Sequence, residues 1–126
     1  MAQAGPGGLA TRGTQVASVE EAFRRLTIGD PDFVAAVGDR EMRAQGVPHL
    51  DARTEALMRV AALVAVDAPA SSFRSAVCAA QIAGARLEDL FAVLVAISDD
   101  VGSARVISAA PRIALAAGYD VEAALE

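Results

Sequence analysis

Side chains with catalytic chemistry are scarce in this 126-residue sequence, which contains a single histidine, His49, and a single cysteine, Cys78. One cysteine cannot form a disulfide within the chain, and a Cys/His zinc site needs ligands that the sequence lacks. Carboxylates are plentiful, because Asp and Glu together number 16. We therefore expect no metal site and no cofactor, which leaves acidic side chains and the thiol as the reactive groups.

Three carboxylates are candidates for acid–base chemistry. Asp99 and Asp100 are adjacent, and two carboxylates that are buried together raise one another's pKa and can act as an acid–base pair. The competing and commoner role is to cap a helix that begins at Val101, where the helix dipole favours negative charge. Glu55 precedes Arg59 by four residues, so a surface ion pair is the ordinary interpretation and a displaced acid or base is the alternative.

The thiol and a nearby small-residue surface are the other candidates. We expect Cys78 to be a packed structural thiol, and a peroxidatic cysteine that an external thiol resolves is the alternative. His49 falls in a predicted loop, exposed or at an interface. The candidate ligand-binding face on the same predicted helix as the thiol consists of Ser72, Ser75, Ala76 and Ala79. No base lies near these serines in the sequence, which argues against a nucleophilic role.

Helices are the only elements that the sequence predicts, and about six of them form a compact all-α domain over residues 18–118. They run from the Ser18 cap to about 27, from the Asp30 cap to a stop at 46–48, from the Asp51 cap to a stop at 67–69, and over about 70–83, 87–98 and 101–117, the last with a kink at Pro111. The fifth is expected to direct toward the core Leu87, Leu90, Phe91, Leu94 and Val95. Residues 1–17 are expected to be a disordered lead, and residues 119–126 an acidic tail with one turn capped by Asp120.

Composition excludes several classes of partner. A net charge of −5 with scattered arginines offers no basic stripe for nucleic acid or for an anionic membrane. Apolar residues make up 54% of the chain, but no apolar run reaches the ~18 residues that span a bilayer. The first residues lack a secretory pattern, so we expect a cytoplasmic protein. The 30 alanines favour closely packed helices.

Two stretches carry a family resemblance, LDARTEALMRVAALVAVDAP and AVCAAQIAGARLEDLFAVLVAISDDVGSARVISA. Together with EEAFRRLTIGDPDFV they resemble the carboxymuconolactone decarboxylase family, which includes the alkylhydroperoxidase D-like proteins. The resemblance covers roughly residues 18–117 and is strongest in the Leu-Asp-x-Arg-Thr opening, the Ala-x-x-x-Gly-Ala helix end, the acidic helix start and the later Val-Gly. It implies an all-α fold and a homo-oligomer, a trimer or a hexamer.

The catalytic groups of that family are missing from the matching positions. Peroxidase members use Cys-x-x-Cys-x-x-x-His with a Glu on the preceding helix, and decarboxylase members use a His with a Glu one turn earlier. The matching positions here are Ala56, Pro69, Ser72, Ala76 and Ala96. None of these side chains forms a thiolate or has an acid–base group whose pKa can lie near neutral pH.

We therefore expect a homo-oligomeric module that binds a small hydrophobic molecule or serves in assembly. The alternative is a diverged enzyme for peroxide reduction, decarboxylation or lactone chemistry, using Cys78 or recruited carboxylates.

Overall fold

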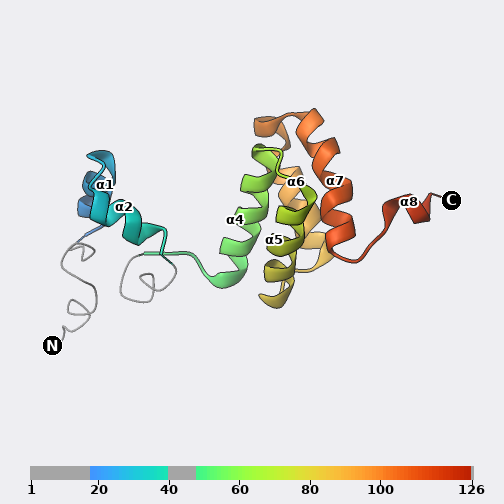
Figure 1. Ribbon diagram of the computed structural model, residues 1–126, viewed down its shortest axis with the longest axis horizontal. Coiled ribbons are helices and arrows are strands. Elements are labelled where there is room, and N and C mark those ends of the chain that lie inside the picture. The colour runs from blue at the N-terminus through green and yellow to red at the C-terminus, as the bar shows by residue number, and fades with distance from the viewer. Residues whose placement is uncertain (1–17, 40–47, 126) are drawn as a thin grey trace. The chain divides into compact units, whose positions relative to one another are not determined.

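The computed structural model describes residues 18–39 and 48–125, and within these ranges the chain forms seven helices and no strand (Figure 1). The all-α prediction is confirmed for this part of the chain. The chain divides into two units, residues 1–49 and residues 50–126. None of the described helices is long and apolar enough to span a bilayer.

Two short helices, α1 (Val19–Thr27) and α2 (Pro31–Val37), make up the described part of the first unit. The side chain of Ser18 accepts a hydrogen bond from a backbone N–H in the first turn of α1, and Asp30 does the same for α2, as the capping pattern predicts. The sequence predicts that the second helix continues without a break to residues 46–48, and this is wrong because the helix that begins at Pro31 is shorter. It stops at Val37, and residues 40–47 lie outside the described part of the chain.

A buried arginine shares the interior of this small unit with the apolar residues Phe33 and Ala36. Arg25 is only 8% exposed, and its guanidinium lies 4.6 Å from the centroid of the Phe33 ring. The same guanidinium is 3.0 Å from the carboxylate of Asp30, so the charge is paired as well as stacked. Partial desolvation raises the pKa of Asp30, but hydrogen bonds from Arg25 and from the α2 N-terminus outweigh it and leave that pKa below its ordinary value.

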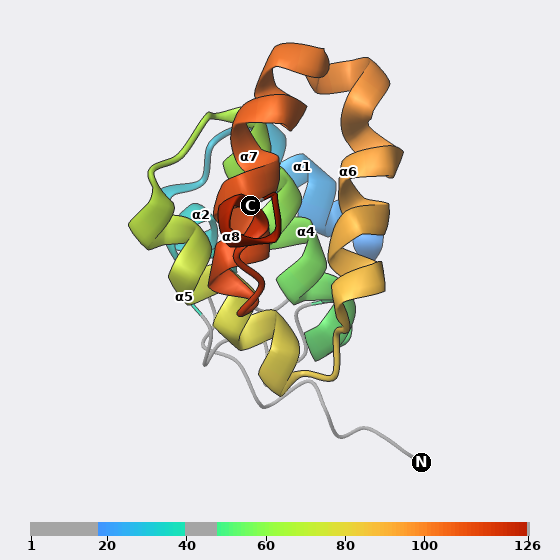
Figure 2. The ribbon, with the colours of Figure 1, turned by 90° about the vertical axis from the view of Figure 1, so that its right-hand side faces the viewer.

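Four longer helices form the second unit: α4 (Ala52–Ala65), α5 (Ala70–Ile82), α6 (Leu87–Val101) and α7 (Ser103–Ala116). They match the expected third to sixth helices, and Asp51 caps α4 as predicted, accepting the N–H of Thr54 at 2.8 Å. A final turn, α8 (Val121–Ala124), begins at the predicted cap, where Asp120 accepts the N–H of Ala123 at 3.1 Å. Figure 2 looks onto the side of this unit from which α8 extends, with α7 behind it.

Small and β-branched side chains dominate the core of the second unit. Each of its helices from α4 to α7 contributes, and the fully buried residues are Val60, Phe73, Val77, Ala80 and Leu90. On α4, Val60 and Val64 lie one turn apart and are at most 1% exposed. Burial of these apolar side chains is the main force that joins the four helices.

Helix α6 differs from expectation because it carries apolar residues on two faces. Leu90 and Leu94 are buried as predicted, but Leu87, Phe91 and Val95 are 47%, 66% and 62% exposed. Residues repeat every four positions in each of the two stripes, and the helix does not bury both stripes against the same neighbours. The prediction that all five face the core is therefore wrong for the outer three.

The α6–α7 connection is a single residue. Gly102 has φ +88°, and a Cβ added there would meet nothing within 4 Å. The glycine is therefore required by its backbone angle and not by a close approach of another chain segment. The turn also places Asp99 and Asp100 inside the last turns of α6, so the prediction that they cap a helix at Val101 is wrong.

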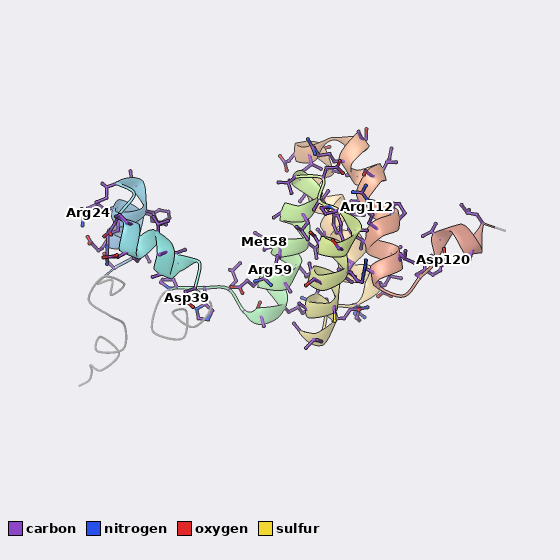
Figure 3. The ribbon with its side chains drawn as sticks, viewed as in Figure 1. Arg24, Asp39, Met58, Arg59, Arg112 and Asp120 are labelled. Atoms are coloured by element: carbon purple, nitrogen blue, oxygen red, sulfur yellow. The ribbon has the colours of Figure 1, made fainter. Side chains whose placement is uncertain are left out.

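Polar clasps connect elements that are distant in sequence. Arg112 of α7 donates to the Ala68 carbonyl at 2.7 Å and lies 3.3 Å from the Asp67 carboxylate, which also accepts from Ser108 at 3.0 Å (Figure 3, in which Arg112 is labelled). Asp67 has φ +53°, a left-handed conformation that few residues other than glycine adopt easily, although Asp is among them. The clasp fixes the turn between α4 and α5 against α7.

Candidate functional site

An apolar groove lies between α6, α7 and the segment that follows α7, and its volume is about 740 Å³. We call it the α6–α7 groove. It is lined by Leu87, Glu88, Leu90, Phe91, Leu94, Ala110, Pro111, Ile113, Ala114, Tyr119, Val121 and Leu125. Ten of these twelve side chains are apolar, so the groove suits an apolar occupant.

The groove has a buried floor and an exposed rim. Leu90, Leu94 and Ile113 form the floor and are at most 5% exposed, since their other sides belong to the core. Phe91 of α6 and Leu125 beyond α8 are 66% and 82% exposed and form part of the rim. A rigid floor therefore supports a rim whose apolar side chains would lose contact with water when an occupant binds.

The rim contains two polar side chains. Glu88 lies in the first turn of α6, where a negative charge is favoured by the helix dipole. Tyr119 is 49% exposed, and its backbone N–H donates to the Ala114 carbonyl at 2.9 Å, which holds the segment after α7 close to that helix. One carboxylate and one phenol can orient the polar end of an occupant, but they include no base placed against a nucleophile.

The start of α6, which carries two residues of the rim, is fixed by an adjacent carboxylate. Asp89 accepts the backbone N–H of Arg86 at 2.8 Å and lies 2.7 Å from the guanidinium of Arg53 on α4. The hydrogen bond from the Arg86 backbone, followed by that from Arg53, lowers the pKa of Asp89 below its ordinary value. The ionised carboxylate thus connects the first turns of α4 and α6.

No family model, no curated protein and no solved structure matches this chain.

The reactive residues singled out in the sequence do not line the groove. Glu55 forms the ordinary i,i+4 contact with Arg59, at 3.5 Å between carboxylate and guanidinium. Asp99 and Asp100 are exposed at the end of α6, so the buried acid–base pair does not form within the described residues. Cys78 is exposed on α5, and the expectation of a packed thiol is wrong because residue 78 faces away from the buried positions 76, 77 and 80.

The small-residue face of α5 is only partly accessible. Ala76 is 6% exposed and belongs to the core, Ala79 and Ser72 are partly buried, and Ser75 is exposed. None of the four lines the α6–α7 groove. The neighbouring helices therefore pack closely against Ala76.

The other positions that match catalytic groups of the family differ in how exposed they are to solvent. Ala56 of α4 is 4% exposed and lies in the core, whereas Pro69 precedes α5 and Ala96 of α6 is exposed. His49 is exposed, as expected. Among the described residues no three His, Cys, Asp or Glu side chains are grouped to hold a metal ion.

The sequence pattern did not predict the groove. Its second wall comes from α7 and from residues after α7, which the pattern places in the helical core and in the acidic tail. A signal for it exists in the spacing. Ala110 and Pro111 lie four and three residues before Ala114 on α7, all three line the groove, and none of them is charged. An apolar stripe in excess of what one core needs predicts a binding surface.

Proposed function

We propose that this chain is a non-catalytic, homo-oligomeric helical module that binds a small hydrophobic molecule in the α6–α7 groove. The observation that carries the proposal is the groove itself, about 740 Å³ in volume with ten apolar side chains among twelve. Sites for small molecules are typically of this size and of this composition, with a few polar groups that set orientation. Glu88 and Tyr119 supply those groups here.

The same proposal includes a relationship to the carboxymuconolactone decarboxylase family. It is supported by the order of helices over residues 52–116 and by the sequence motifs that begin with Leu-Asp-x-Arg-Thr. Alanine, proline and serine stand at the positions matched to catalytic groups, which favours binding over turnover. Homo-oligomer formation is supported by the exposed apolar residues of α6 and α7.

Binding of a neutral fluorescent probe tests the proposed function. N-phenyl-1-naphthylamine, whose emission rises in apolar surroundings, is titrated into the full chain and into the variant Ala114→Trp. Ala114 lines the groove and is partly buried, so an indole at this position occupies the space that the probe needs. We expect the variant to bind at least roughly tenfold more weakly, equivalent to about 1.4 kcal/mol.

The matched control is Ala62→Trp, which adds the same side chain at an exposed position of α4 outside the groove. The control should bind the probe as the unaltered chain does. Absence of saturable binding to the unaltered chain, or equal weakening by both substitutions, would show that the groove is not a ligand site. Circular dichroism of both variants verifies that the helices are intact.

A further inference from the structure

The charge of the α6–α7 groove comes from one side chain, the carboxylate of Glu88. Of the other lining residues, all are apolar except Tyr119, so no positively charged side chain of the described part of the chain lines the groove. The polar end of an occupant therefore meets a negative charge that no neighbouring cation in the groove balances. Coulomb attraction favours a cationic group at this place and disfavours an anionic one.

The carboxylate of Glu88 is available to a ligand. It is exposed in the first turn of α6, and within the residues that the structure describes it forms neither an ion pair nor a hydrogen bond. The two arginines that contact this turn, Arg53 and Arg86, pair instead with the adjacent Asp89, at 2.7 Å and 3.7 Å. The oxygens of Glu88 are thus not engaged by the cations closest to it in the sequence and on α4.

Aromatic rings line the same groove beside this carboxylate. Phe91 follows Glu88 by three residues on α6, so the two side chains are neighbours on one face of the helix. Phe91 and Tyr119 are 66% and 49% exposed, which leaves part of each ring accessible. The face of an aromatic ring attracts a cation. A positive group that pairs with Glu88 therefore lies next to a second element that favours it.

We propose that the occupant of the α6–α7 groove is a hydrophobic cation, an amine or ammonium compound whose apolar part lies on the buried floor and whose positive group pairs with Glu88. This inference names the ligand class of the proposed function and rests on it. The net charge of −5 acts in the same direction, because an acidic chain raises the concentration of cations near its surface and lowers that of anions. Fatty acids and other amphiphilic anions are disfavoured for the same reason.

Displacement of N-phenyl-1-naphthylamine from the full chain compares three ligands that share a ten-carbon tail. Decylamine is protonated at pH 7, as the lysine side chain is, decanoate is ionised, and 1-decanol is uncharged. We expect decylamine to bind at least roughly tenfold more tightly than decanoate at low ionic strength, because Glu88 attracts one head group and repels the other. Decanol should lie between them. Each ligand is used below the concentration at which it forms micelles.

The variant Glu88→Gln removes the charge and retains the shape of the side chain. The preference for decylamine over decanoate should fall below roughly threefold, while decanol should bind as it does to the unaltered chain. The matched control is Asp100→Asn, which removes one carboxylate from an exposed position of the same helix outside the groove. This control changes the net charge equally and should keep the full preference.

Three results would overturn the proposal: decanoate binding as tightly as decylamine, a preference for decylamine that survives Glu88→Gln, or equal loss of the preference in both variants. Circular dichroism of the variants verifies that the helices are intact. A preference that also weakens with added salt agrees with an exposed ion pair, since salt screens such charges.

Failure of this ligand class and failure of the proposed function are distinguishable, because the fluorescent probe is uncharged. If the probe binds and Ala114→Trp weakens it, but decylamine has no advantage over decanoate, the groove remains a ligand site and the preference for a cation is wrong. If the probe does not bind saturably and decylamine does not bind either, the proposed function is wrong and this inference falls with it.

Discussion

Removal of the Arg112 guanidinium provides a quantitative test of how the second unit is held together. Arg112 contacts the turn between α4 and α5 across more than forty positions of sequence, through the Ala68 carbonyl at 2.7 Å and the Asp67 carboxylate at 3.3 Å. The substitution Arg112→Met retains most of the aliphatic stem and deletes both interactions. Loss of stability therefore reports on the charged group and not on packing.

The expected loss follows from the two interactions. A hydrogen bond from a charged donor contributes roughly 1.5–3 kcal/mol. The ion pair is weaker, because the Arg112 and Asp67 side chains are 35% and 49% exposed, and exposed pairs contribute about 0.2–1 kcal/mol. We expect the free energy of unfolding to fall by about 2 kcal/mol and the midpoint of thermal unfolding to fall by about 10 °C for a unit of this size.

Urea denaturation followed by circular dichroism measures the change at pH 7. The matched control is Arg105→Met on the same helix, since Arg105 is exposed and makes no ion pair within the described residues. The control should change the free energy of unfolding by less than about 0.5 kcal/mol. A loss below about 0.5 kcal/mol in Arg112→Met, or equal losses in both variants, would refute the argument that the clasp stabilises the unit.

Four further outcomes are expected. Leu90→Ala should lower the free energy of unfolding by about 3 kcal/mol, and Leu87→Ala by less than about 1 kcal/mol, because only Leu90 is fully buried; urea denaturation of both variants compares them. Gly102→Ala should cost about 1–2 kcal/mol in the same assay, since its φ of +88° is unfavourable for alanine, and a neutral result would contradict the assigned turn. The ionised carboxylate of Asp89 should contribute its full stabilisation above the usual Asp pKa near 4, and this contribution should be lost as pH decreases through the lowered pKa of Asp89. Asp89→Asn should therefore make the free energy of unfolding less dependent on pH between pH 7 and pH 3. Cys78→Ser should leave thermal unfolding within about 1–2 °C of the unaltered chain, because the thiol is exposed.

The sequence predicted those parts of the fold that short-range signals determine. Asp51 and Pro69 indicate where α4 and α5 begin, and the structure begins them there. Asp120 likewise predicted the cap of α8. Such signals act within a few residues of the chain, so they can be interpreted without knowing which helices become neighbours.

Features that depend on distant neighbours were not predicted. Asp99 and Asp100 carry the pattern of a helix cap, but packing continues α6 past them to Gly102. Leu87 and Phe91 have the spacing of core residues, and only the position of α7 shows that they border a groove. The same holds for Arg112 and Asp67, whose pairing depends on how α7 crosses the turn between α4 and α5.

Burial of the α5 alanines limits which substitutions the sequence of this module can accept during evolution. Ala76 and Ala80 are 6% and 0% exposed, so each side chain occupies a space shaped for a methyl group. An imidazole or a carboxylate introduced at Ala76 would need both volume and hydrogen-bond partners that the neighbouring helices do not provide. A single substitution of this kind at Ala76 would therefore destabilise the fold, and selection would remove it before any new catalytic activity could be favoured. Reactivity is acquired more easily at the solvent-facing rim of α6 and α7, where a new polar side chain costs little stability.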